Sequence, residues 1–274
     1  MTAGFEALLA SDFTARSDRP LDRALQVARE RDGRLVIAHV LETGEGDPGP
    51  GSALIERLRR DLPREAHGAE LVVRTGSAPK MLARLAAERG SDLIVTGVAR
   101  YNHIGDYVLG TAVDHIVRNA DAPVLVVKGR VRGPYAHMVV ATDLSDCSRA
   151  ALLVAARLFP DTAITLVHAF HVPFEGWLKS DEVKQDVRAE AREELDRFLA
   201  HPDVAALTAR IEPLIDEGET GSVVVRQLNR TGADLLVLGT HGRSGFVHAT
   251  IGSQAEALLA TVGVDVLMVR ERKG

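Results

Sequence analysis

Short runs of apolar residues alternate with amphipathic stretches along the whole chain. The apolar runs, such as LVIAHV and LIVTG, are continuous rather than alternating, which is typical of strands buried on both faces of a parallel sheet. In the first half the pattern predicts strands at 5–11, 35–41, 69–74, 92–97 and 123–128, and helices at 18–31, 52–66, 78–89 and 111–120. This order predicts an α/β fold with an open, doubly wound parallel sheet.

The second half carries the same alternation of strands and helices. We predict strands at 137–142, 163–169, 208–215, 234–239 and 264–270, and helices at 146–158, 176–200, 221–231 and 253–262. The third of these strands has the least support, because Pro213 lacks an amide proton and is disfavoured inside a sheet.

Four segments of the first half recur in the second half in the same order. FEALLASDFT matches HMVVATDLSD, and RLVIAHVLE matches AITLVHAFH with a histidine at the same place in each. SDLIVTG matches ADLLVLG, and APVLVVK matches VDVLMVR. We interpret the repeat as a duplication, with a linker in the Gly- and Pro-containing segment 129–136. It predicts two tandem domains with five-stranded sheets, at residues 1–130 and 137–274.

Charge and composition narrow the class of protein. The chain has 274 residues, a net charge of -5 and a hydrophobic fraction of 46%. It has no sustained basic run, so it lacks the electrostatic footprint of a duplex-DNA binder. No stretch approaches the roughly 20 apolar residues that cross a membrane, and a single cysteine, Cys147, suits a reducing compartment. We therefore expect a cytoplasmic protein that contacts neither nucleic acid nor membrane.

The loop after the fourth strand of the second half is rich in glycine. Gly239 closes the strand, Gly242 follows, and Gly252 and Ser253 open the next helix. Glycine allows a backbone to approach a phosphate closely, and the free amides of a helix N-terminus attract anions. Ligands of doubly wound sheets bind beyond the carboxyl ends of the strands. The sequence therefore predicts an anion site here, to which Arg243 would add positive charge.

The spacing Gly239-x2-Gly242-x9-Gly252-Ser253 resembles the G-x2-G-x9-G-(S/T) nucleotide signature of ATP-binding universal stress proteins. The segments DLLVLG and HMVVATDLSD also look like that family, and the resemblance covers nearly all of both halves. It implies an adenine nucleotide alpha hydrolase-like, Rossmann-like fold and a role as a stress-response regulator or signalling module. The implied ligand is ATP, with any Mg²⁺ held mostly by the phosphates of the nucleotide.

The family pattern assigns roles to matching residues of the second half. Asp143 would contact the nucleoside, and Leu238 would pack on the base. The implied nucleotide-binding residues are Ala141, Thr142, Asp143, Ala169, Leu238, Gly239, Gly242, Arg243, Gly252, Ser253 and Gln254. An alternative role for Asp143 is to cap the helix that follows it.

The first half departs from the family pattern at one position. Arg100 stands where the second half has Gly242, so its side chain either fills the phosphate space or contacts the phosphates as a cation. The residues of this weaker candidate site are Ser11, Asp12, Val40, Gly97, Arg100, Gly110 and Thr111. We leave open whether it binds ATP, and expect nucleotide mainly in the second half.

Signals for catalysis or for a protein-bound metal are weak. The sequence shows no recognisable Ser-His-Asp or Cys-His arrangement, Walker A motif or zinc-ligand cluster. His39 and His168 recur at equivalent strand positions, and we expect them to be structural or to line a pocket. We therefore expect no catalytic residue and no metal ligand, with a slow ATPase or an adenylyl-transfer enzyme as the alternative.

Association with other proteins stays open at this level. One further alternative is an adaptor in which nucleotide binding is incidental. The family resemblance implies pairing through the last strand, either between the two halves or in a homodimer. A regulatory protein partner would remain to be identified.

Overall fold

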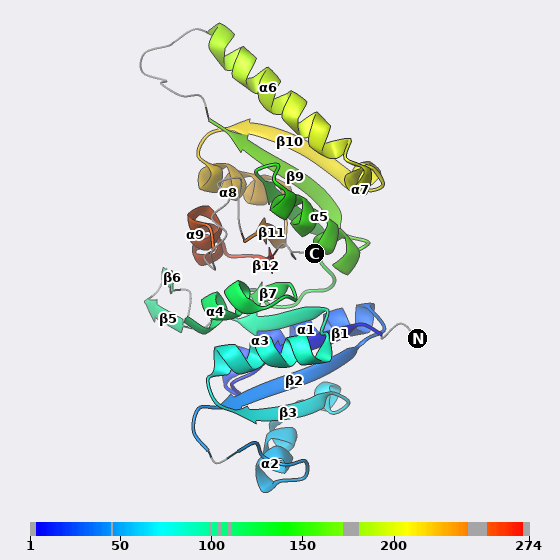
Figure 1. Cartoon of the computed structure of the whole chain (residues 1–274), viewed down its shortest axis with the longest axis vertical. Helices are drawn as coiled ribbons and strands as arrows, with labels where there is room; N and C mark the ends of the chain where they lie inside the picture. Colours follow the sequence, from blue (N-terminus) through cyan, green and yellow to red (C-terminus); the bar gives the residue numbers. More distant parts are fainter. Residues whose placement is uncertain are drawn as a thin grey trace. The chain divides into compact units, whose positions relative to one another are not determined.

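The chain divides between Pro134 and Tyr135 into two compact units. The structure is a computed structural model (Figure 1). It describes residues 4–44, 46–98, 100–103, 106–108, 111–171, 181–240 and 251–270, with backbone alone at 100–103, 106–108, 111–112 and 181–182.

The first unit contains a parallel sheet in which the strands lie in the order β3-β2-β1-β4-β7. The strands are β1 (Glu6–Ala10), β2 (Arg34–Leu41), β3 (Glu70–Thr75), β4 (Leu93–Gly97) and β7 (Val124–Val127). The helices are α1 (Asp18–Glu30), α2 (Ala53–Asp61), α3 (Ala78–Arg89) and α4 (Thr111–Asn119). Short 3-10 turns lie at η1 (Ala15–Ser17) and η2 (Arg64–Ala66).

The second unit repeats this plan, with strand order β10-β9-β8-β11-β12 and all pairs parallel. Its strands are β8 (His137–Thr142), β9 (Ala163–Phe170), β10 (Ile211–Glu217), β11 (Leu235–Gly239) and β12 (Asp265–Val269). Its helices are α5 (Asp146–Leu158), α6 (Asp181–Leu199), α7 (Pro202–Ala205), α8 (Thr220–Thr231) and α9 (Ser253–Thr261), with a 3-10 turn η3 (Thr208–Arg210).

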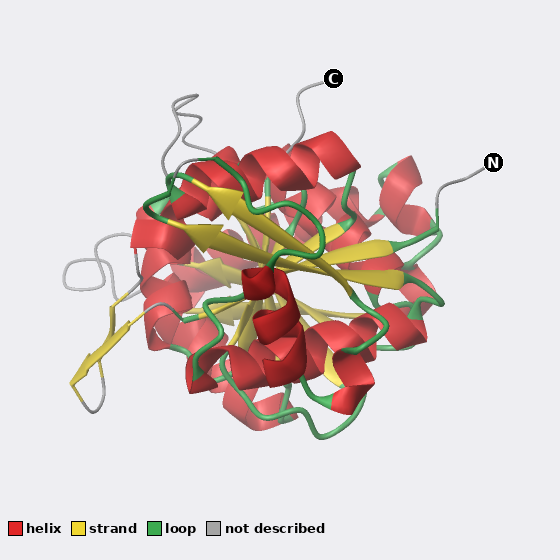
Figure 2. Ribbon diagram, turned by 90° about the horizontal axis from the view of Figure 1, so that it is seen from below, coloured by secondary structure: helices red, strands yellow, loops and turns green. Residues whose placement is uncertain are grey.

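Helices lie on both sides of the strands (Figure 2). The central strands are mostly apolar because both of their faces are covered: Leu8, Leu93 and Leu235 are completely buried. The strand order reverses between β1 and β4 in the first unit, and between β8 and β11 in the second. The predicted α/β fold class, with five parallel strands in each unit, is confirmed.

Four details differ from the sequence prediction or extend it. The predicted helix 52–66 ends at Asp61, because Pro63 cannot continue it, and only the turn η2 follows. Pro213 is tolerated within β10 because this strand lies at an edge of its sheet. The long helix α6 begins at Asp181, and the predicted start at 176–180 lies outside the described residues. The antiparallel hairpin of β5 (Arg100–His103) and β6 (Asp106–Val108) was not predicted.

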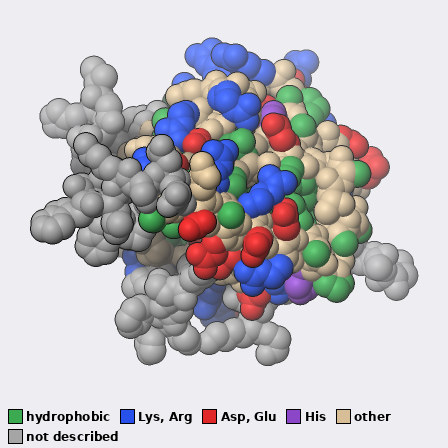
Figure 3. All heavy atoms as spheres, turned by 90° about the horizontal axis from the view of Figure 1, so that it is seen from above, with side chains coloured by type: hydrophobic (Ala, Val, Ile, Leu, Met, Phe, Trp, Pro, Cys, Tyr) green, Lys and Arg blue, Asp and Glu red, His purple; other side chains and the backbone are tan. Residues whose placement is uncertain are grey.

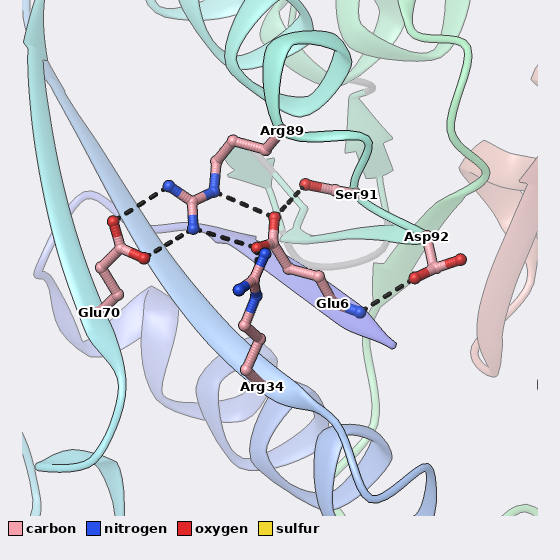
Figure 4. A network of polar contacts seen from close by, with 6 residues as sticks. All are labelled: Glu6, Arg34, Glu70, Arg89, Ser91 and Asp92. Carbon is pink, nitrogen blue, oxygen red and sulfur yellow. Dashed lines mark hydrogen bonds and ion pairs between the residues drawn. The ribbon is translucent and has the colours of Figure 1, made fainter. Parts of the chain in front are cut away.

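A buried carboxylate organises the amino ends of the strands in the first unit (Figure 4). Glu6 on β1 is 2% exposed and accepts hydrogen bonds from Arg34 Nε at 2.7 Å, Arg89 Nη2 at 3.0 Å and Ser91 Oγ at 2.7 Å. Asp92 in turn accepts from the backbone N–H of Glu6 at 3.0 Å. Burial alone would raise the pKa of Glu6, but the hydrogen bonds and the charges of Arg89 and Arg34 lower it overall.

The surface carries charges of both signs. Figure 3 shows one face of the molecule, on which basic and acidic side chains are interspersed with apolar ones. Of the helices that the structure describes, none is both long and apolar enough to span a membrane.

Candidate functional site

A pocket of about 380 Å³ lies at the carboxyl ends of β8, β9 and β11 in the second unit. This is the point where strand order reverses, which is where open α/β sheets bind their ligands. Its volume falls within the roughly 300–1,000 Å³ of small-molecule sites. The pocket is lined by nine predicted residues: Ala141, Thr142, Asp143, Ala169, Leu238, Gly239, Gly252, Ser253 and Gln254. The predicted Gly242 and Arg243 lie outside the described residues.

The turn after β8 places Asp143 at the pocket. Ser145 donates to Asp143 Oδ1 twice, from its backbone N–H at 3.1 Å and from its hydroxyl at 2.6 Å. Leu144 between them has a left-handed φ of 63°, and its N–H donates to Thr142 Oγ1 at 2.9 Å. The N-cap of α5 is Ser145, whose Oγ accepts from Ser148 N at 3.2 Å. The alternative in which Asp143 caps the helix is therefore wrong.

His168 on β9 forms part of the pocket wall and is 9% exposed. Its Nδ1 lies 2.9 Å from the carbonyl oxygen of Thr142. Because a carbonyl oxygen only accepts, Nδ1 carries a proton and donates it to this oxygen. The expectation for His168 is confirmed: it lines the pocket, and it also joins β9 to β8 through this hydrogen bond.

Glycine at the end of β11 has a packing reason. A Cβ at Gly239 would lie 3.0 Å from Cys147 Sγ and 3.3 Å from the Cys147 carbonyl group on α5. The close approach of α5 therefore disfavours a side chain at this position, whatever ligand is bound. At Gly252 the nearest atom of the described residues to an added Cβ is Thr240 O, at 3.7 Å, which is an ordinary van der Waals contact.

The first turn of α9 faces the pocket through Gly252, Ser253, Gln254 and Ala255. Gly252 is its N-cap and provides no side-chain hydrogen bond to the helix. The backbone N–H groups that open a helix carry partial positive charge and attract anions. This end of the pocket is therefore suited to an anionic group.

The first turn of α8 lies beside the same pocket and is capped differently. Thr220 and Val224 line the pocket, and neither was predicted from the sequence. Glu219 accepts hydrogen bonds from Gly221 N at 2.9 Å and Ser222 N at 2.8 Å, and these backbone bonds lower the pKa of Glu219. A carboxylate of the chain already occupies this helix N-terminus, so an anionic ligand group is directed to α9. Thr220 could have been found from the sequence because it lies just after the third strand of the second unit, and ligands bind beyond the carboxyl ends of such strands.

The first unit has a smaller pocket at the equivalent place, with a volume of about 200 Å³. Of the predicted residues, Ser11, Asp12, Val40 and Gly97 line it. Gly110 lies outside the described residues, and so do the side chains of Arg100 and Thr111. Arg16 and Thr96 also line the pocket and were not predicted.

The turn after β1 repeats the turn after β8. Asp12 Oδ1 accepts from Thr14 N at 2.9 Å, Thr14 Oγ1 at 2.8 Å and Ser17 Oγ at 2.8 Å. Phe13 has a φ of 56°, and His39 Nδ1 lies 2.9 Å from Ser11 O. Burial raises the pKa of Asp12, but the hydrogen bonds from Thr14 and Ser17 and the nearby positive charge lower it overall.

Metal ligands do not gather in the described part of the chain. Among those residues, no group of three or more His, Cys, Asp or Glu side chains is placed to hold a metal ion.

Sequence comparison identifies related proteins. The universal stress protein family model matches the chain twice, over residues 6–128 and 134–270. A universal stress protein of Mycolicibacterium smegmatis is 22% identical over an alignment of 293 positions. The alignment covers 97% of this chain and 97% of that protein. Universal stress protein A homolog 1 of Coxiella burnetii is 31% identical over 143 residues, which cover 49% of this chain and 96% of that protein.

Solved structures share the fold over nearly the whole chain. A Pseudomonas aeruginosa protein described as functionally unknown matches with a TM-score of 0.72 at 20% identity, covering 98% of this chain and 93% of that one. A universal stress protein of Archaeoglobus fulgidus matches with a TM-score of 0.65 at 14% identity, covering 97% and 98%. Since the family model covers both halves, the chain belongs to the universal stress protein family.

Proposed function

We propose that this universal stress protein binds ATP in the pocket of the second unit and acts as a stress-response regulator or signalling module. The observation that carries the proposal is the joint placement of three features in one pocket. These are the carboxylate of Asp143, the apolar side chain of Leu238 and the N-terminus of α9, which lacks a side-chain cap. They match the three parts of a nucleotide, which are sugar hydroxyls, an apolar base and phosphates.

Each feature recognises one part of the ligand by ordinary chemistry. An ionised carboxylate only accepts hydrogen bonds, so Asp143 selects donor groups such as ribose hydroxyls. Leu238 and Val167 supply apolar surface for a flat base. The backbone amides of Ser253 and Gln254 at the start of α9 favour the phosphates. Bound Mg²⁺ would balance phosphate charge and be held mostly by phosphate oxygens.

The two units would differ in their use of nucleotide. The pocket of the first unit is about half as large, at about 200 Å³ against about 380 Å³. A hydroxyl side chain, Thr96 on β4, lines it at the place that Leu238 holds on β11. Both differences favour the second unit as the main ATP site. Occupancy of that site would then control the binding of a regulatory partner protein.

The experiment compares two matched variants, Asp143→Ala and Asp12→Ala. Nucleotide released from the denatured protein is separated by chromatography, and ATP affinity is measured by calorimetry with and without Mg²⁺. We expect bound adenine nucleotide in the wild type, at least a tenfold loss of affinity in Asp143→Ala, which is roughly 1.4 kcal/mol, and little change in Asp12→Ala. Absence of nucleotide together with no heat of binding would contradict the proposal.

The same samples separate binding from turnover. We expect ATP to remain intact during prolonged incubation with the purified protein. Hydrolysis that survives repurification and is lost in Asp143→Ala would instead make the protein a slow ATPase.

A further inference from the structure

Both units hold the aspartate after their first strand with a hydroxyl residue two positions later. Ser145 Oγ donates to Asp143 Oδ1 at 2.6 Å, and Thr14 Oγ1 donates to Asp12 Oδ1 at 2.8 Å. In each case the backbone N–H of the same hydroxyl residue donates to the same oxygen, at 3.1 Å and 2.9 Å. The two units have diverged around this turn, yet the paired donation to one carboxylate oxygen is present in both.

The backbone between the two residues makes this contact possible. Leu144 and Phe13 lie in the left-handed region, with φ of 63° and 56°. This conformation is costly for residues with a Cβ, and it persists only where surrounding contacts maintain it. It turns the chain so that the N–H and O–H of Ser145 reach the same oxygen of Asp143.

Ser145 also connects the aspartate to a rigid element. Its hydroxyl oxygen is the N-cap of α5 and accepts from Ser148 N at 3.2 Å. The helix lies against β8, β11 and β12, and its residues Ala151 and Leu152 are completely buried. Because the hydroxyl is fixed by the helix on one side, its proton fixes the Asp143 carboxylate on the other.

We propose that Ser145 is a positioning residue of the second pocket, which orients the Asp143 carboxylate toward the ligand's hydroxyl donors. Asp143 lines the pocket, whereas Ser145 is not among the described residues that do. Ser145 therefore acts through Asp143 rather than on the ligand. The inference rests on the proposed function for its ligand, but its geometry does not depend on ATP.

The test uses two substitutions that separate capping from orientation. Ser145→Gly removes the hydroxyl, while glycine is tolerated at a helix N-cap at small cost. Ser145→Thr retains a hydroxyl in the arrangement that Thr14 already shows in the first unit. Thermal unfolding verifies that both variants are folded, and adenosine serves as an uncharged ligand beside ATP.

We expect Ser145→Gly to weaken adenosine and ATP binding roughly three- to tenfold, the value of one hydrogen bond, and Ser145→Thr to bind like the wild type. In an Asp143→Ala background, Ser145→Gly should cause no further loss, because the partner of the hydroxyl is already absent. Equal losses in both backgrounds would overturn the inference, since they would mean that Ser145 acts independently of Asp143. Thr14→Gly is the matched control and should leave binding in the second unit unchanged.

A crystal structure of Ser145→Gly decides the inference even if the wild type binds no adenine nucleotide. We expect the Asp143 carboxylate to rotate away from its wild-type orientation. A carboxylate that keeps its position without the hydroxyl would overturn the positioning role, whereas failure of the wild type to bind would overturn only the proposed function.

Discussion

His168 on β9 donates its Nδ1–H to the carbonyl oxygen of Thr142 on β8 at 2.9 Å. The first unit repeats this bond between His39 and Ser11, also at 2.9 Å. In both units an imidazole thus ties the second strand to the end of the first strand, beside the pocket. The bond fixes the backbone from which the pocket aspartate follows.

The variant His168→Phe should lower the free energy of unfolding by about 1–2 kcal/mol, because it keeps a ring but leaves the Thr142 carbonyl without this donor. It should also weaken ATP binding, since Thr142 and Asp143 line the pocket. Urea denaturation and calorimetry measure the two effects. His39→Phe is the matched control and should lower stability similarly while leaving ATP affinity unchanged. Unaltered stability in both variants would show that the imidazole bonds contribute nothing.

Glu6→Gln should destabilise the first unit by about 2 kcal/mol at neutral pH, because Arg34 and Arg89 lose their shared carboxylate. The value lies below the roughly 3–5 kcal/mol of a fully buried pair, since Arg34 is 63% exposed and Arg89 is 21% exposed. Urea denaturation measures the loss. The exposed pair Arg84–Glu88 on α3 is the control, and Glu88→Gln should cost less than about 0.5 kcal/mol.

The stabilisation by Glu6 should depend on pH in a defined direction. Its pKa in the folded protein is below the ordinary value of 4.5, so its stabilisation is present above that value and is lost as the pH falls through the folded pKa. The difference in stability between wild type and Glu6→Gln should therefore shrink from about pH 6 to about pH 3. A difference that stays constant over this range would rule out the ion pairs as its source.

Gly239→Ala should destabilise the second unit by about 1–3 kcal/mol, because its Cβ would come too close to Cys147. Adding Cys147→Ala removes the sulfur atom and should recover part of the loss, so the two substitutions should be non-additive. Gly252→Ala is the control for added bulk, since the nearest atom among the described residues lies at 3.7 Å. Thermal unfolding distinguishes the cases, and additive effects would contradict the proposed contact.

The left-handed backbone at Leu144 gives a further prediction. Leu144→Val should destabilise the protein by about 1–2 kcal/mol, because a β-branched residue is strained at a φ of 63°. Leu144→Gly should lie within about 0.5 kcal/mol of the wild type, because relief of strain offsets the greater flexibility of the unfolded chain. Urea denaturation measures both. A glycine variant as unstable as the valine variant would mean that lost packing, not backbone strain, dominates.

Much of the fold and of the candidate site was readable from the sequence. Strands buried on both faces produce continuous apolar runs, so β1, β4, β8 and β11 were found close to their true bounds. Residues such as Asp143 and Ala169 were assigned because they match the family pattern. They lie at the carboxyl ends of two neighbouring strands, which meet at one edge of the sheet. The hairpin of β5 and β6 was missed, since such short strands leave no clear period.

Other features depend on the three-dimensional arrangement of the chain. The sequence suggested Asp143 as a helix cap, but the turn at Leu144 assigns that role to Ser145. The sequence associated Gly239 with phosphate, whereas the approach of Cys147 on α5 supplies an independent reason for glycine. Thr220 entered the pocket only because α8 packs beside β8 and β9.

The sequence by itself determined the duplicated α/β plan, because burial and the alternation of strands and helices along the chain are encoded in local apolar patterns. Only the tertiary structure decided how the pocket aspartates are held, which helix N-terminus is left without a side-chain cap and how large each pocket is. These properties arise from the packing of α5, α8 and α9 on the sheet, where a shift of about one ångström changes which hydrogen bonds can form.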